Sequence, residues 1–201
     1  ILNITASEAI YQMATGRMGG RHAGDILERL VEDTDYEGLL RSWIVLDNHD
    51  TERLAHMMPE PWQRRFAQTL QFTVPGSPNL YYGTELGMDG AGDPANRAPM
   101  RWDLVNDDNQ DLAFVRRLIA LRRESRALRI GDWRLLDSTQ VLAFQRYTDR
   151  VEECRIILAN VSDAPVTEVL PIRDSKLMNW TQLADTLSDY RVQVVCGMIH
   201  A

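Results

Sequence analysis

An uninterrupted apolar run leads directly into a dense polar cluster near residue 50. Residues 43–46 read Trp-Ile-Val-Leu, and Asp47, Asn48, His49 and Asp50 follow at once. A strand without polar interruption is typical of a parallel sheet that is covered on both faces. In parallel β/α barrels the loops after the carboxyl ends of the strands carry the catalytic groups. We therefore predict a buried strand whose following loop presents Asn48, His49 and Asp50. Taken alone, these three residues favour a turn with a helix cap, because Asn and Asp are common in both.

Helical and strand patterns alternate up to about residue 130. Apolar spacing predicts helices over 5–14, 25–33, 61–73 and 111–127. Thr5 and Glu8 match a capping box at the start of the first helix. Residues 80–82 form a second predicted strand, which opens a long loop over 83–107 that is rich in Gly, Asp, Asn and Pro.

Beyond about residue 133 the pattern changes to short β-rich runs. They lie at 141–147, 154–159, 165–170 and 191–200, separated by Asp, Ser and Pro clusters. Such spacing predicts antiparallel strands. The chain therefore reads as β/α followed by a small all-β module.

Composition excludes several classes of partner. The formal net charge is −7 and no Lys/Arg run occurs, which argues against nucleic acid and polybasic membrane contacts. No apolar stretch approaches the roughly 20 residues that span a bilayer. Cys154 and Cys196 are the only cysteines, and as two buried, unpaired thiols they suit a reducing compartment, so we expect a cytoplasmic location.

Two motifs carry a resemblance to a known family. IVLDNHDTER, followed by SPNLYYGTELGMDGAGDPANRAPMRWD, resembles the α-amylase superfamily of glycoside hydrolases, at barrel strands seven and eight. LIALRRESRALRIGDWRLL resembles the last barrel helix running into the β-sandwich of that family. The DPANRAPMRWD form is most similar to cyclomaltodextrinases, neopullulanases and maltogenic amylases.

The resemblance implies an α/β plus all-β architecture. Residues 1–130 would be strands six to eight of a (β/α)8 TIM barrel, and residues 131–201 an antiparallel C-terminal β-sandwich, truncated at its end. Residues 1–3 resemble the end of strand six, which would leave strands one to five outside this chain. We expect a C-terminal portion of a longer enzyme.

The resemblance also implies a chemistry. Family members are retaining hydrolases of α-glucosidic bonds, here in maltooligosaccharides, cyclodextrins or related α-glucans. Asp50 matches the transition-state-stabilising aspartate, and His49 the histidine that binds the same sugar. Asn48 would orient them or serve the fold alone.

Three further candidates come from the second motif. Tyr82 would stack on a glucose ring or pack at a strand end. Asp93 and Arg97 would bind sugar near the non-reducing end or only pair with each other. Glu85, His22, His56 and His200 are taken as incidental or structural, and the acidic residues Asp103, Asp107 and Asp108 as a solvated loop rather than a metal site.

The nucleophile and the general acid/base of a retaining hydrolase have no match in this chain, so we expect the chain alone to be inactive. Its partners would be an α-glucan oligosaccharide and the rest of the parent barrel, with a homo-oligomer left open. No cofactor is expected, although the missing part of the parent has room for a structural calcium. The alternative function is a non-catalytic, α-amylase-like ancillary or glucan-binding protein. A carbohydrate-binding role of the β-rich segment would require surface aromatics, for which Trp133, Tyr147, Trp180 and Tyr190 are scattered candidates.

Overall fold

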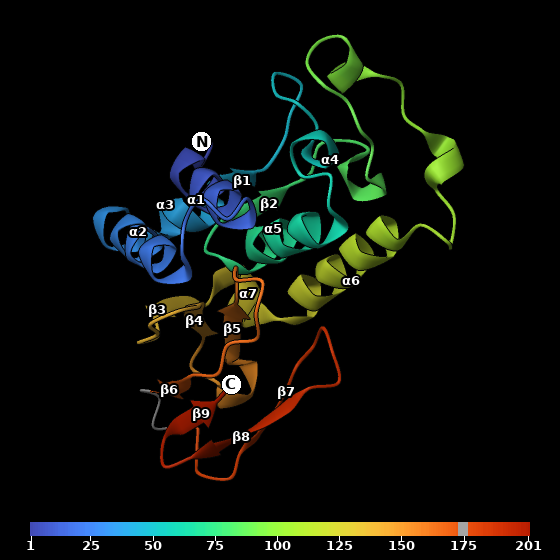
Figure 1. Cartoon of the computed structure of the whole chain (residues 1–201). Helices are drawn as coiled ribbons and strands as arrows, with labels where there is room; N and C mark the ends of the chain where they lie inside the picture. The colour runs from blue at the N-terminus through green and yellow to red at the C-terminus, as the bar shows by residue number, and fades with distance from the viewer. Residues whose placement is uncertain (173–176) are drawn as a thin grey trace.

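The computed structural model describes residues 1–172 and 177–201 and has two parts (Figure 1). The first part packs helices around a small parallel ribbon, and the second consists of antiparallel strands. The helices are α1 (Ile4–Ala14), α2 (Gly20–Asp33), α3 (Tyr36–Arg41), α4 (Leu54–Met57), α5 (Pro61–Thr73), α6 (Gln110–Glu124) and α7 (Arg126–Ile130). Within the described residues, no helix is long and apolar enough to cross a membrane.

The parallel ribbon contains β1 (Trp43–Val45) and β2 (Ser77–Asn79), paired from Trp43 with Ser77 to Val45 with Asn79. On the other side of β1, Leu2 forms an isolated parallel bridge with Trp43. The strand predicted at 43–46 is present as β1, but it is not buried along its length, because Trp43 is 51% exposed and only Ile44 is fully buried. The strand predicted at 80–82 is wrong, because β2 lies three residues earlier and the 80–82 segment belongs to a turn.

Hydrogen bonding explains that shift. The carbonyl of Tyr81 accepts the Thr84 N–H at 3.1 Å, and Gly83 adopts φ 82°, a conformation that closes a turn and that glycine adopts without strain. Pro78 tolerates its place in β2 because this strand is an edge of the two-stranded sheet, where a missing N–H is least costly.

The ribbon is covered by α1 and α5, and α2 packs against α1. Buried side chains form one cluster around Ile44, which itself is fully buried. Members with at most 2% exposure include Ile10, Met13, Leu27, Leu54 and Leu70. The helix cap predicted for α1 is wrong: Asn3 is the N-cap, and its Oδ1 accepts the Ala6 N–H at 3.0 Å. Glu8 instead accepts a hydrogen bond from Gln12 within the helix.

The helix predicted at 111–127 is divided at Ser125. Its backbone leaves the helical conformation there, and its hydroxyl accepts the Leu128 N–H at 3.4 Å to start α7. Serine competes with helix propagation by bonding to nearby backbone, which makes it a favoured N-cap. The chain therefore turns before it enters the β-rich part.

Over residues 132–172 and 177–201, the β-rich part holds two sheets. One contains β3 (Asp132–Leu135), β4 (Leu142–Tyr147) and β5 (Arg155–Ala159) in that order. The other has the order β6 (Val169–Pro171), β9 (Met198–His200), β8 (Arg191–Val195), β7 (Gln182–Ala184). Both are antiparallel, as predicted, and a second buried cluster that includes Leu136, Val141, Leu170, Val194 and Ile199 packs between them.

One detail of the β-rich part differs from the prediction. The thiols were expected to be buried, but Cys154 is only partly buried and Cys196 is exposed in the turn between β8 and β9. The carboxylate of Glu168 accepts hydrogen bonds from the hydroxyls of Ser138 and Thr139 and from backbone N–H groups of the same turn. This turn joins β3 to β4, so Glu168 ties the two sheets together.

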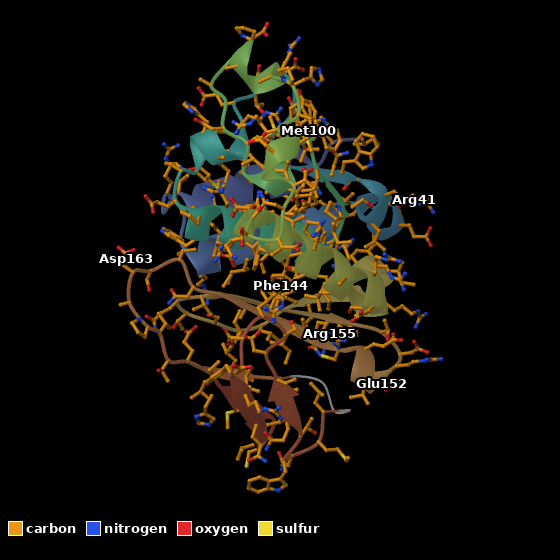
Figure 2. The ribbon with its side chains drawn as sticks, turned by 90° about the vertical axis from the view of Figure 1, so that its right-hand side faces the viewer. Arg41, Met100, Phe144, Glu152, Arg155 and Asp163 are labelled. Atoms are coloured by element: carbon orange, nitrogen blue, oxygen red, sulfur yellow. The ribbon has the colours of Figure 1, made fainter. Side chains whose placement is uncertain are left out.

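The two parts of the chain share a buried junction. Phe144 of β4 stacks on Trp133 with ring centroids 4.3 Å apart, and both belong to the cluster around the helices. Figure 2 shows Phe144 where the helices meet the β-rich part. Arg146 is fully buried and donates to the carbonyls of Thr73 at 2.8 Å and Gly131 at 2.9 Å. The boundary at residue 131 stays a prediction, because the packing runs across it.

Candidate active site

The polar loops after β1 and β2 leave the ribbon at the same edge, because the two strands run parallel. The first covers residues 47–53. The second, over 83–107, contains the short 3-10 turns η1 (Thr84–Leu86), η2 (Ala95–Arg97) and η3 (Trp102–Leu104). In Figure 1 this long loop rises above the ribbon and α4. All six predicted site residues lie in or directly before these two loops.

The 48–51 turn is closed by its own side chains. Asn48 Oδ1 accepts the Asp50 N–H at 2.7 Å, and the Asn48 N–H donates to Thr51 Oγ1 at 3.0 Å. This is the geometry for which Asn is favoured in turns. The contacts give Asn48 a structural role in placing Asp50.

His49, Asp50, Asp93 and Arg97 come together at the rim. His49 Nε2 lies 3.2 Å from Asp50 Oδ2, and Arg97 Nη2 lies 3.4 Å from Asp50 Oδ1. Arg97 Nε is also 3.8 Å from Asp93 Oδ1. The Asp93–Arg97 pair exists, and Arg97 bridges it to Asp50. The side chains of His49 and Asp50 are 62% and 70% exposed, so both remain accessible to a ligand.

The η2 turn holds the backbone of this cluster. The His49 carbonyl accepts hydrogen bonds from Asn96 Nδ2 and Arg97 Nε, each at 2.9 Å, and Asn96 Nδ2 also donates to the Thr51 carbonyl at 2.8 Å. Asn96 is buried. The second loop therefore fixes the position of the first.

Tyr82 is 38% exposed and is held at both ends of its side chain. Its hydroxyl donates to the Ala98 carbonyl at 2.7 Å, and its ring packs edge-on against Tyr81 at 4.6 Å. The Arg53 guanidinium lies 4.4 Å from its ring centroid. These contacts are those of a packing residue, and stacking on a sugar stays a prediction.

Sequence reasoning missed the residues beneath the loops. Asp47 is 2% exposed and accepts the Leu54 N–H at 2.9 Å and the Thr84 hydroxyl at 2.8 Å. Burial raises the pKa of Asp47, although these hydrogen bonds and the nearby Arg53 guanidinium act in the opposite direction. Arg53 is fully buried and donates to the Tyr82 carbonyl. The only sequence signal was the position of Asp47 as the first polar residue after the apolar run.

Other polar residues near the loops form pairs with neighbouring charged side chains. His56, which the sequence left without a partner, lies 3.0 Å from Asp89. Asp103 pairs with Arg101, which lowers the pKa of Asp103. Among residues 1–172 and 177–201, no group of three His, Cys, Asp or Glu side chains has a metal-binding arrangement.

Comparison with known proteins identifies the relatives of this chain. A family model of the alpha amylase catalytic domain matches residues 21–111. The intracellular maltogenic amylase of Bacillus subtilis is 30% identical over 72% of this chain and 25% of its own length. Neopullulanase 2 of Thermoactinomyces vulgaris is 33% identical over 69% of this chain and 24% of its own length. The chain thus spans about a quarter of these curated relatives.

A solved structure extends the likeness to nearly the whole chain. The α-amylase of Anoxybacillus superimposes with a TM-score of 0.77 at 25% identity, over 98% of this chain and 42% of that structure. The match includes the β-rich part, which the family model does not reach.

Proposed function

Because this chain belongs to the α-amylase family of glycoside hydrolases, we propose that it forms part of a retaining α-glucoside hydrolase. Its substrates would be maltooligosaccharides, cyclodextrins or related α-glucans. The observation that carries the proposal is the placement of Asp50 just beyond β1, a parallel strand whose central Ile44 is fully buried, with His49 and Arg97 within 3.4 Å of the Asp50 oxygens. The printed names of the relatives, a maltogenic amylase and a neopullulanase, support the substrate class. The name of the Bacillus subtilis relative also supports a cytoplasmic location.

We assign the parallel segments to strands six to eight of a (β/α)8 barrel. Leu2, β1 and β2 lie side by side in that order. Three strands do not close a barrel of eight, and the chain matches about a quarter of its curated relatives. Residues 131–201 would be the β-sandwich that packs beneath this barrel.

Asp50 would stabilise positive charge as the glycosidic bond breaks. Retaining glycosidases pass through an oxocarbenium-like transition state, and a fixed carboxylate that accepts sugar hydroxyls strengthens those bonds as charge develops. His49 would donate to the same sugar. Arg97 would orient Asp50, because its Nη2 lies 3.4 Å from Asp50 Oδ1.

The nucleophile and the general acid/base would come from the remainder of the barrel. Both are required for the double displacement. The chain by itself would therefore hold the rim of the pocket without the groups that break the bond, and we expect it to be inactive alone.

Two assays test this proposal. The isolated chain is incubated with maltoheptaose and with β-cyclodextrin, and no release of reducing ends is expected; robust turnover would refute the claim that catalytic groups are missing. The chain is then fused behind the barrel segment of the Bacillus subtilis relative that precedes the matched region. Hydrolysis by this chimera is expected, and its absence in a folded chimera would support a non-catalytic, ancillary role.

Substitution of Asp50 in the chimera separates catalysis from folding. Asp50→Asn is expected to lower kcat by about 10²–10³-fold, the usual effect of removing one group that stabilises transition-state charge. Asp163→Asn is the matched control, because Asp163 lies on a loop of the β-rich part, well away from the loop that carries Met100 (Figure 2). Equal activity of both variants would contradict the role of Asp50.

A further inference from the structure

A cavity opens beside the candidate active site, between α1 and the carboxyl ends of the Leu2 segment and β1. It has a volume of about 300 Å³, and its lining includes Ile4, Glu8, Tyr11, Leu46, Asn48 and Met57. We refer to it as the α1 cavity. We propose that the α1 cavity is a subsite for one sugar unit of the α-glucan, an inference that rests on the function proposed above.

The lining has the mixed chemistry that a pyranose ring requires. A sugar ring presents C–H groups on its faces and hydroxyls around its edge, so its sites combine apolar or aromatic surfaces with a few polar groups. Ile4, Leu46 and Met57 supply apolar surface, and Tyr11 supplies an aromatic ring. Tyr11 is partly buried against the core, which limits its motion.

The polar groups of the cavity retain capacity to bind. Glu8 uses Oε1 to accept a hydrogen bond from Gln12. Within the described part of the chain, its second oxygen, the Tyr11 hydroxyl and Asn48 Nδ2 have no protein hydrogen-bond partner. One acceptor, one amide donor and one hydroxyl therefore line the same space.

Asn48 connects the α1 cavity to the rim cluster. It lines the cavity, while its Oδ1 accepts the Asp50 N–H at 2.7 Å. A sugar that binds Asn48 would therefore contact the same turn that carries Asp50. The volume lies at the lower end of the range for ligand pockets, roughly 300–1,000 Å³, which suits one ring rather than a longer oligosaccharide. A site of this size predicts weak binding, with a Kd of about 1 mM.

Titration of the chain with maltose, followed by backbone amide NMR signals, tests the proposal. We expect saturable shifts at Glu8, Tyr11 and Asn48, and none when glycerol replaces maltose at the same concentration. Tyr11→Phe and Glu8→Gln should each weaken the binding by about 5-fold, the effect of losing one hydrogen bond. Glu152→Gln, which changes an exposed glutamate of the β-rich part, is the control and should leave the Kd unchanged.

The outcomes separate this subsite from the proposed catalytic function. Shifts confined to His49, Asp50 and Arg97 would overturn the subsite and leave the proposed function standing. The absence of any shift, or shifts that glycerol reproduces, would also overturn the subsite. A chimera that shows no hydrolysis while maltose still shifts Glu8 and Tyr11 would instead count against the catalytic proposal alone.

Discussion

Replacement of Arg146 by methionine tests whether one buried cation joins the helices to the β-rich part. Its guanidinium is fully buried and donates to three carbonyls, those of Thr73 at 2.8 Å, Gly131 at 2.9 Å and Asp132 at 3.3 Å. Thr73 is the last residue of α5, where helix carbonyls lack partners within the helix. Methionine is also a long, unbranched side chain, but it has no hydrogen-bond donor.

The magnitude follows from two opposing effects. Hydrogen bonds to a charged group contribute about 1.5–3 kcal/mol each, so the loss of three such bonds is a large destabilisation. The desolvation of the guanidinium offsets part of it, since burial lowers the pKa of Arg146. A buried acceptor that loses its donor costs about 1–3 kcal/mol, so three carbonyls that lose Arg146 should cost about 3–5 kcal/mol in total after this offset. We expect this loss for Arg146→Met, which is a large part of a typical stability of about 5–15 kcal/mol.

Urea denaturation, followed by circular dichroism and by tryptophan fluorescence, measures the effect. Both signals should report one transition in the original chain, because the buried junction couples the two parts. Arg129→Met is the matched control: Arg129 is exposed on α7, and its replacement should change the free energy of unfolding by less than about 0.5 kcal/mol. A loss of less than about 1 kcal/mol in Arg146→Met, with one transition retained, would refute this reasoning.

Three shorter predictions concern pH and packing. Burial raises the pKa of Glu168, but hydrogen bonds from hydroxyl and amide donors outweigh burial and lower this pKa to about 2. The contribution of Glu168 to folding stability is therefore complete above its unfolded pKa and is lost as pH falls towards 2. Glu168→Gln should remove about 1–2 kcal/mol of this acid-dependent stability after allowance for solvent screening, measured by urea midpoints between pH 7 and 2. Burial raises the pKa of Asp47, so ionisation of Asp47 destabilises the fold as pH rises above its unfolded pKa. The stability of Asp47→Asn, relative to the original chain, should therefore increase as pH rises through this range. A stability difference between the two chains that is independent of pH would contradict this. Gly20→Ala places a Cβ 2.2 Å from the Leu142 nitrogen and should cost about 3 kcal/mol, whereas Gly92→Ala, with open space around it, should be near neutral in thermal unfolding.

Local sequence patterns predicted much of the fold. The apolar run at 43–46 contains β1, and Pro61 marks the start of α5, where a missing N–H has no cost. The antiparallel strands were found because short β-rich runs and turn residues alternate there. These elements depend on residues that are close in sequence, so local patterns are sufficient to predict them.

The errors arose where hydrogen bonds, rather than apolar spacing, decide the structure. The 80–82 segment has strand-forming residues, yet Arg53 and Thr84 bond to its carbonyls and turn it away from the ribbon. The helix at 111–127 has continuous apolar spacing, yet Ser125 ends one helix and begins another. Neither outcome follows from hydrophobic periodicity, because each depends on turn and capping hydrogen bonds that apolar spacing does not indicate.

The same distinction explains which site residues were found. His49 and Asp50 were found because they follow an apolar run and match a motif of the family that the chain resembles, whereas Asn96 was assigned no role. Yet Asn96 is buried and donates to two carbonyls of the first loop, at 2.9 Å and 2.8 Å. The loss of such donors leaves buried carbonyls without partners, which is costly. The residues that would act on a substrate are thus exposed and recognisable, while those that position them are buried and identified only through the packed structure.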